Sequence, residues 1–201
     1  MKISKTKSCK YWKQLKSEII SDFDNEDLWT EAIKLFEERI KYRYLKPISK
    51  IEKGKNHEGE GYAIMTIYCS LIEFLETINQ GINFKLENPD KSKFEYSVRK
   101  SKKIYISFLT NRFGFKISKS LAKQFYVNVR CGLLHEAKLG SNWLIRVDSA
   151  KLIGDVDGNI VLNRKLFSER IKKYLKKYTT QLVKDEELKK AFIRKYDYLC
   201  E

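Results

Sequence analysis

Proline is scarce along this chain, and that scarcity is the strongest limit on its fold. Only two of the 201 residues are proline and nine are glycine, so long helices meet few residues that break them. A strongly apolar stretch from about Gly61 to Asn79 predicts one such helix, with its C-terminal stop at Gly81. Because 42% of the residues are hydrophobic, the chain can build a real core, and we expect a mainly α-helical fold.

Apolar residues recur at helical spacing in five further stretches. These predicted helices cover residues 10–21, 26–46, 117–134, 163–180 and 185–199. Residues 104–113 fit a helix or a strand, and we favour a helix because the neighbouring segments are helical.

Polar residues at the predicted helix starts are of the types that cap helices. Asp24 or Asn25, Ser118 or Ser120, and Asn163 fill this role in the sequence. Pro47 marks the expected end of the second helix.

Two connections and one hairpin interrupt the helices. Gly54 to Gly61 reads as a polar loop, and residues 81–103 as a long, mobile connection. After Gly140 the pattern predicts short strands, and Asp157-Gly158 is a strong signal for a hairpin turn. We therefore expect one domain over residues 1–201, with a small β-hairpin at about 142–162 before the C-terminal helices.

The positive charge is concentrated in one part of the chain. Lys and Arg outnumber Asp and Glu by 41 to 26, which gives a net charge of +15 and favours a polyanionic partner. Residues 99–138 carry ten bases and one acid, whereas residues 17–40 carry eight acids and two bases. A Lys-rich chain with an ordinary solvated surface remains an alternative explanation of the charge.

Arg130 and His135 stand five residues apart inside this basic stretch. The chain has only two histidines. A histidine changes charge near neutral pH, and an arginine holds phosphate with a planar fork of donors, so the pair suits phosphodiester chemistry. On a regular helix these positions lie about 140° apart. Either the helix ends or distorts near Gly132, or two chains bring their motifs together, and we favour the second arrangement.

Glu73 is an acid inside the apolar stretch Ala63 to Leu75. An unpaired buried charge is costly, so Glu73 needs a partner, and Arg130 is the obvious candidate. Alternatively, Glu73 lies on a solvated stripe with Glu76 and Asn79. Arg130 could also be only a core strut, with His135 favoured at the helix C-terminus.

An apolar helix that bears an acid, a variable loop, and a helix ending in Arg-x4-His together resemble the HEPN superfamily (higher eukaryote and prokaryote nucleotide-binding domains). The string Arg-Cys-Gly-Leu-Leu-His-Glu at 130–136 is similar to a bacterial branch of that superfamily. The resemblance covers about residues 25–180. It implies a HEPN-like helical bundle, a homodimer, and metal-independent endoribonuclease activity in a toxin or an anti-phage defence effector.

The resemblance also implies roles for individual residues. Arg130 and His135 would be catalytic, and Glu73 would be an orienting acid. Many relatives have a polar residue where this chain has Cys131, and some toxins carry a modified tyrosine where it has Ala137. We expect an RNA partner, an antitoxin or defence-system protein, and no cofactor or metal.

The chemistry of RNA agrees with this assignment, because the 2′-hydroxyl supplies the nucleophile. Exposed lysines are the expected RNA contacts: Lys119, Lys123, Lys138, Lys172, Lys173, Lys176 and Lys177. A non-catalytic RNA-binding or dimeric adaptor module is the main alternative. A DNA-binding regulator is disfavoured, since no helix-turn-helix pattern stands out.

The cysteines and the most apolar stretch of the sequence indicate the cellular compartment. None of the four cysteines forms a Cys-x-x-Cys pair, and Cys69 and Cys131 read as small hydrophobes within helices. The window Tyr62 to Ile78 contains two glutamates and is too short for a membrane span. We therefore expect a cytoplasmic protein that does not enter the membrane.

Overall fold

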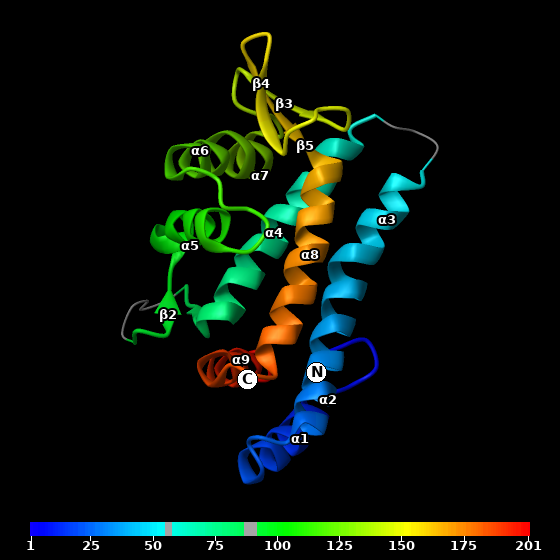
Figure 1. Ribbon diagram of the computed structural model, residues 1–201, viewed down its shortest axis with the longest axis vertical. Coiled ribbons are helices and arrows are strands. Elements are labelled where there is room, and N and C mark those ends of the chain that lie inside the picture. The colour runs from blue at the N-terminus through cyan, green and yellow to red at the C-terminus, as the bar shows by residue number, and fades with distance from the viewer. Residues whose placement is uncertain (55–57, 87–91) are drawn as a thin grey trace. The chain divides into compact units, whose positions relative to one another are not determined.

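The computed structural model describes residues 1–54, 58–86 and 92–201. The chain is mainly α-helical with small sheets, as predicted (Figure 1). It divides into two compact units. Unit 1 comprises residues 1–47, 77–99 and 178–201, and unit 2 comprises residues 48–76 and 100–177.

The helices lie close to the predicted ranges. They are α1 (Cys9–Ser21), α2 (Glu26–Ile40), α3 (Lys46–Glu52), α4 (Glu60–Gln80), α5 (Val98–Asn111), α6 (Lys119–Phe125), α7 (Gly132–Glu136), α8 (Arg164–Leu182) and α9 (Glu186–Tyr198). Two π-helical turns, η1 (Lys41–Leu45) and η2 (Tyr126–Cys131), join α2 to α3 and α6 to α7. The ambiguous stretch at 104–113 is helical, as we favoured, within α5.

Three helices begin at the predicted capping residues, and each of these side chains accepts hydrogen bonds from the first turn of its helix. Asn25 accepts hydrogen bonds from the N–H groups of Asp27 and Leu28, so it rather than Asp24 caps α2. Ser118 caps α6, and Asn163 caps α8. Gly81 follows α4 with φ of +64°, the left-handed conformation expected of a C-terminal stop.

The predicted hairpin is present in unit 2. Strands β4 (Ile153–Val156) and β5 (Asn159–Asn163) pair antiparallel. Asp157 and Gly158 both have positive φ, at +52° and +78°, which is the geometry of a tight hairpin turn. Strand β3 (Trp143–Arg146) pairs parallel with β5, so the sheet order is β3-β5-β4 (Figure 1).

Pro47 does not end the second predicted helix, so that expectation is wrong. The chain passes from α2 through η1 into α3, which contains Pro47. At η1 the N–H of Lys46 bonds to the carbonyl of Lys41, five residues earlier. A proline ring clashes with the carbonyl four residues before it, and a wider turn just ahead of the proline relieves that crowding.

The stretch 81–103 is not one long connection, which corrects a second expectation. Strands β1 (Asn83–Phe84) and β2 (Glu95–Tyr96) pair parallel, and α5 begins at Val98. Strands of two residues are too short to show an alternating pattern, so no sequence signal predicted them. Residues 87–91 of this stretch lie outside the described residues.

Unit 2 has an aromatic core that gathers four helices. Phe167 of α8 lies 5.4 Å from Tyr68 of α4 and 6.0 Å from Phe125 of α6, measured between ring centroids. Phe108 of α5 reaches the same cluster through Phe115, at 5.0 Å. These rings are buried, and their burial fixes α4, α5 and α6 relative to one another.

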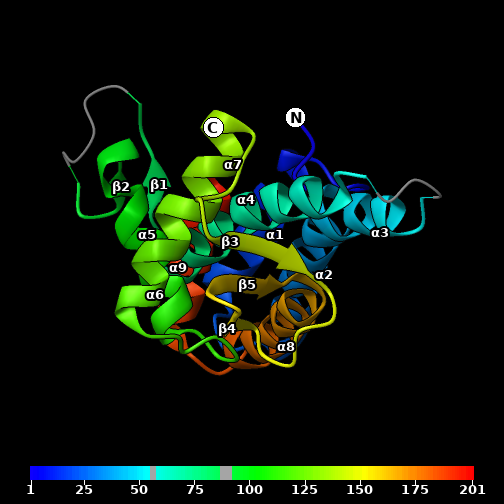
Figure 2. The same ribbon diagram turned by 90° about the horizontal axis from the view of Figure 1, so that it is seen from above.

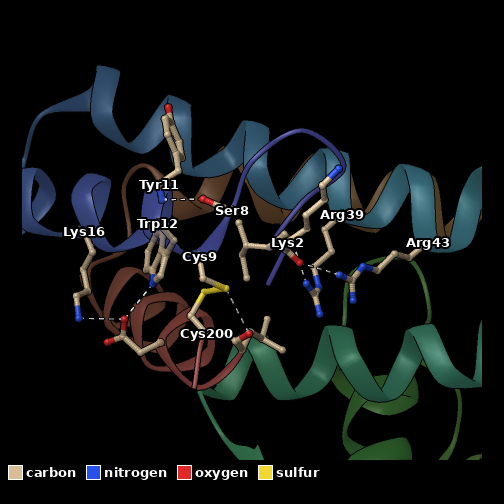
Figure 3. The surroundings of a disulfide bond; sticks show 12 residues. Lys2, Ser8, Cys9, Tyr11, Trp12, Lys16, Arg39, Arg43 and Cys200 are labelled. Atoms are coloured by element: carbon tan, nitrogen blue, oxygen red, sulfur yellow. Dashed lines mark hydrogen bonds and ion pairs between the residues drawn. A yellow bond between two sulfur atoms is a disulfide. The ribbon is translucent and has the colours of Figure 1, made fainter.

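Unit 1 contains a disulfide that the sequence did not reveal. Cys9 of α1 is bonded to Cys200, just after α9 (Figure 3). Beside it, the indole N–H of Trp12 donates to Asp197 at 2.9 Å. The two cysteines are 191 positions apart, so no local spacing could suggest their pairing.

Helix α4 is long and apolar enough to cross a membrane by length and composition alone. Its residues Ile64, Met65, Tyr68 and Leu71 are fully buried in the protein, as in the core helix of a globular fold.

Glu76 of α4 is fully buried, which excludes the alternative of a solvated stripe formed by Glu73, Glu76 and Asn79. Arg112 donates two hydrogen bonds to the Glu76 carboxylate, at 2.7 and 2.8 Å, and Ser107 donates a third at 2.6 Å. A buried carboxylate with these partners ties α5 to α4, the two helices that supply Glu73, Ser101 and Tyr105 to the site described below.

Replacing Glu76 by alanine should destabilise the protein by about 3–5 kcal/mol, because Arg112 is left with an uncompensated charge. Urea unfolding followed by circular dichroism measures the change. Asp148→Ala is the matched control, since Asp148 also accepts two hydrogen bonds from an arginine, Arg146, but in solvent. It should cost about 0–1 kcal/mol. Equal losses in the two variants would contradict the prediction.

Candidate functional site

The predicted helix at 117–134 contains an extra residue in one of its turns. Helix α6 passes into the π-helical turn η2, and α7 then continues from Gly132 to Glu136. In η2 the N–H of Gly132 bonds to the carbonyl of Val127, five residues earlier. A π turn holds more residues than an α turn, so each residue advances by a smaller angle. Arg130 lies in this turn and His135 lies just after it.

The widened turn brings the Arg-x4-His side chains together within one chain. Arg130 Nη1 lies 3.3 Å from His135 Nε2. The two positions would lie about 140° apart on a regular helix, which left either a distorted helix or two chains as the explanation. A distorted helix is sufficient to form the contact. The arrangement we favoured, with two chains supplying one site, is not needed to form the pair.

The two residues of the pair differ in their exposure. His135 is exposed on the surface, whereas the Arg130 side chain is only 15% exposed. A guanidinium group only donates hydrogen bonds, so a hydrogen bond at this 3.3 Å contact needs an imidazole nitrogen that accepts. The exposed imidazole can contact a molecule bound at the surface.

A tight turn after α7 packs directly on η2. Ala137 has φ of +51°, and its N–H and that of Lys138 both point to the carbonyl of Gly132. A side chain on Gly132 would place its Cβ only 2.4 Å from the Lys138 carbonyl oxygen. The N–H of Gly140 then donates to the carbonyl of Asn128 at 2.9 Å. Gly132 is therefore required by a close backbone approach.

Two tyrosine rings enclose the Arg130 guanidinium. Its central carbon lies 5.8 Å from the ring centroid of Tyr105 and 5.5 Å from that of Tyr126. The Tyr105 hydroxyl donates to the carbonyl of Cys69 at 2.6 Å. Burial raises the pKa of Tyr105, so the phenol stays neutral. Burial lowers the pKa of Arg130. Tyr105, Tyr126 and Glu73 raise this pKa by more than burial lowers it, so the pKa of Arg130 lies above its ordinary value.

Glu73 lies near the guanidinium but is held mainly from α5. Its carboxylate is 4.0 Å from Arg130 Nη2, and it accepts hydrogen bonds from Ser101 at 3.3 Å and Tyr105 at 3.4 Å. The structure therefore brings together all three predicted site residues, Glu73, Arg130 and His135. The 4.0 Å separation leaves the Arg130 guanidinium less tightly bound than Arg112 is by Glu76.

A shallow pocket of about 310 Å³ opens beside His135. Apolar atoms dominate its wall, which is formed by Val127, Asn128, Cys131, Gly132, His135, Glu136, Lys138, Leu139 and Gly140. Cys131 is half-buried there, whereas Cys69 is fully buried. Burial raises the pKa of the Cys69 thiol to about 12, as expected for a small hydrophobe in the core.

The predicted RNA-binding lysines are all exposed, but they fall into two groups. Lys119 and Lys123 lie on α6 and Lys138 follows α7, close in sequence to the Arg130–His135 pair. The other four lie on α8: Lys172, Lys173, Lys176 and Lys177. In Figure 2, β3 and β5 lie between α7 and α8.

Sequence reasoning missed Tyr105, Tyr126 and Ser101 as neighbours of the pair. Tyr126 precedes Arg130 by four positions, a spacing that favours contact on a helix and could have suggested it. Ser101 and Tyr105 come from α5, far away in the sequence, and carried no such signal. Among the described residues, no group of three or more His, Cys, Asp or Glu side chains is arranged to hold a metal ion.

Comparison with known proteins gave no relative. No protein-family model, no curated protein and no solved structure matches this chain.

Gly132→Ala should destabilise the protein by about 1–3 kcal/mol, because the new methyl group collides with the turn at Lys138. The direction of the stability change tests the packing, because a Gly→Ala substitution within an unobstructed helix stabilises a protein by about 0.5–1 kcal/mol. Thermal unfolding measures it, and the NMR signals of the His135 ring should shift at the same time. Gly154→Ala is the control, because its methyl group meets only the flexible side chain of Lys151. A stabilised Gly132→Ala variant with unchanged His135 signals would contradict the proposed packing.

Proposed function

We propose that this protein is a metal-independent endoribonuclease of the HEPN type. The observation that carries the proposal is the Arg130–His135 pair, which lies within hydrogen-bond distance in one chain. An imidazole on the surface, beside a guanidinium whose charge is held by its surroundings, is a minimal set of groups for cleaving a phosphodiester.

In this mechanism His135 takes the proton from the 2′-hydroxyl of RNA. The 2′ oxygen then attacks the adjacent phosphorus, and the bond to the 5′ oxygen of the next nucleotide breaks. The imidazolium returns its proton to that leaving oxygen. The products are a 2′,3′-cyclic phosphate and a free 5′-hydroxyl, and no external nucleophile is required.

Arg130 supports the same step by binding the phosphate. A guanidinium donates through two nitrogens to phosphate oxygens and stabilises the additional negative charge of the transition state. Tyr105 and Tyr126 pack against the guanidinium and limit its movement, which reduces the reorganisation needed when the phosphate binds. Glu73 acts as a positioning residue, because it lies behind Arg130 and is anchored to α5.

The biological setting that we propose follows from the family resemblance. It comprises action as a toxin or an anti-phage defence effector, as a homodimer, with an antitoxin or defence-system protein as a partner. Because Ala137 stands where some family toxins carry a modified tyrosine, we do not propose control by modification at that position.

Purified protein should cleave mixed RNA in the presence of EDTA, and the fragments should end in 2′,3′-cyclic phosphate. His135→Ala and Arg130→Ala should each lower the cleavage rate by about 100-fold or more, since each removes a group that acts on the reacting phosphate. Gel analysis and mass spectrometry of the fragments measure rate and product.

Arg146→Ala serves as the control, because Arg146 is a solvent-exposed arginine outside the site and should be dispensable. An RNA carrying a single 2′-deoxynucleotide should resist cleavage at that position. If wild type and His135→Ala leave RNA equally intact, the protein is not this enzyme.

A non-catalytic RNA-binding module is the second candidate, and the exposed lysines of α8 favour it. Lys172, Lys173, Lys176 and Lys177 occupy successive turns of the basic helix α8. Binding of a phosphate backbone by such lysines releases counterions and weakens with salt, without a need for His135.

Replacing these four lysines by alanine should weaken RNA binding and reduce the slope of log K against log salt by about 3. Fluorescence anisotropy with labelled RNA at several salt concentrations provides the measurement. His135→Ala should leave the slope unchanged. An unaltered slope in the lysine variant would show that RNA is bound elsewhere.

A further inference from the structure

The pocket beside His135 extends the candidate site away from the phosphate. Its wall combines η2, α7 and the turn at 138–140, and His135 belongs both to this wall and to the Arg130 pair. A molecule whose charged group lies against Arg130 and His135 is therefore directly next to the pocket. What fills the pocket must be part of that same molecule or be bound next to it.

The lining favours a flat, largely apolar group with a polar edge. Val127 is 51% exposed at one side, whereas Leu139 is 9% exposed. The half-buried Cys131 and the backbone of Gly132 add further apolar surface. Glu136 and Lys138 supply one acidic and one basic group, so a ligand with both donors and acceptors on its rim is suited to it.

We propose that this pocket receives one nucleobase of an RNA strand, on a nucleotide that adjoins the phosphate bound by Arg130 and His135. This inference rests on the proposed function for the identity of the bound phosphate. A nucleobase has an apolar face and a polar edge. The pocket volume of about 310 Å³ is at the lower end of the range for small-molecule sites. Lys138, exposed at the rim, lies where it can reach a neighbouring phosphate of the strand.

The pocket wall depends on two glycines. The wall exists only because Gly132 and Gly140 let the turn lie against η2, where a Cβ on Gly140 would meet the Asn128 side chain at 2.2 Å. The same close packing that supports the Arg130–His135 contact thus creates the pocket.

The test is an NMR titration of the His135 ring in the full chain. His57→Gln leaves a single histidine, so its signals are assigned without ambiguity. The probes are the four nucleoside 3′-monophosphates, ribose 5-phosphate and inorganic phosphate. At least one nucleotide should bind on the order of tenfold more tightly than ribose 5-phosphate, because only the nucleotide fills the pocket.

Val127→Trp should remove that advantage, because the large ring occupies the pocket while the phosphate ligands remain. Val147→Trp is the matched control: Val147 is 48% exposed, lies outside the pocket wall, and should leave all affinities unchanged. Nucleotides that bind no better than ribose 5-phosphate, or an advantage that survives Val127→Trp, would overturn the proposal.

The failure of this proposal is distinguishable from the failure of the proposed function. If the protein cleaves RNA in EDTA but nucleotides show no gain over ribose 5-phosphate, the nuclease assignment stands and the base pocket is rejected. If the gain is present and abolished by Val127→Trp but RNA remains intact, the pocket is supported and the catalytic assignment is rejected.

Discussion

The extra residue in the turn Tyr126–Cys131 is the constraint on which the candidate site depends. Along a regular helix, Arg130 and His135 would face directions about 140° apart, and neither could assist the other. The π turn reduces that difference, and the long arginine side chain closes the remaining gap to 3.3 Å. A π turn has poorer hydrogen bonding than an α turn and persists only where the surrounding packing favours it. Here the backbone of the turn at Lys138 and Gly140 provides that packing.

The surroundings of Arg130 meet two requirements at once: they stabilise its charge and leave donors for a ligand. As a largely buried cation it needs partners, which Tyr105, Tyr126 and Glu73 supply from three helical segments. As a proposed phosphate ligand it must keep donors available, and the 4.0 Å separation from Glu73 serves that need. The contrast with Arg112 is instructive, because Glu76 holds that guanidinium by two short hydrogen bonds. Of these two arginine–glutamate pairs, one is structural and the other is suited to binding a ligand.

The sequence predicted the parts of the fold that depend on local chemistry. Asn25, Ser118 and Asn163 cap helices, and Asp157-Gly158 makes the hairpin turn, because each acts on backbone within a few residues. Predictions from the sequence were wrong where contacts with residues far away in the chain decide the structure. Pro47 is accommodated by a preceding π turn, and Glu76 is buried because Arg112 reaches it from just beyond the end of α5.

For the site, sequence identified the residue types but not their assembly. Arg130, His135 and Glu73 could be named in advance, because each is chemically unusual in its local setting. The π turn could not, since nothing in Tyr126–Cys131 distinguishes it from an α-helix, and the contacts of Ser101 and Tyr105 depend on α5 packing against α4. Similarly, the pairing of Cys9 with Cys200 depends on where α1 and α9 lie within unit 1.

The central claim is that one chain builds the phosphodiester site by itself, and mixing two inactive variants tests it most directly. Arg130→Ala and His135→Ala chains, carrying different tags, are co-expressed and purified through both tags, and RNA cleavage in EDTA is measured. If each site takes both residues from one chain, the mixed species stays as inactive as either variant. Recovery of a substantial fraction of wild-type cleavage would show that the pair assembles across two chains, and would contradict the account.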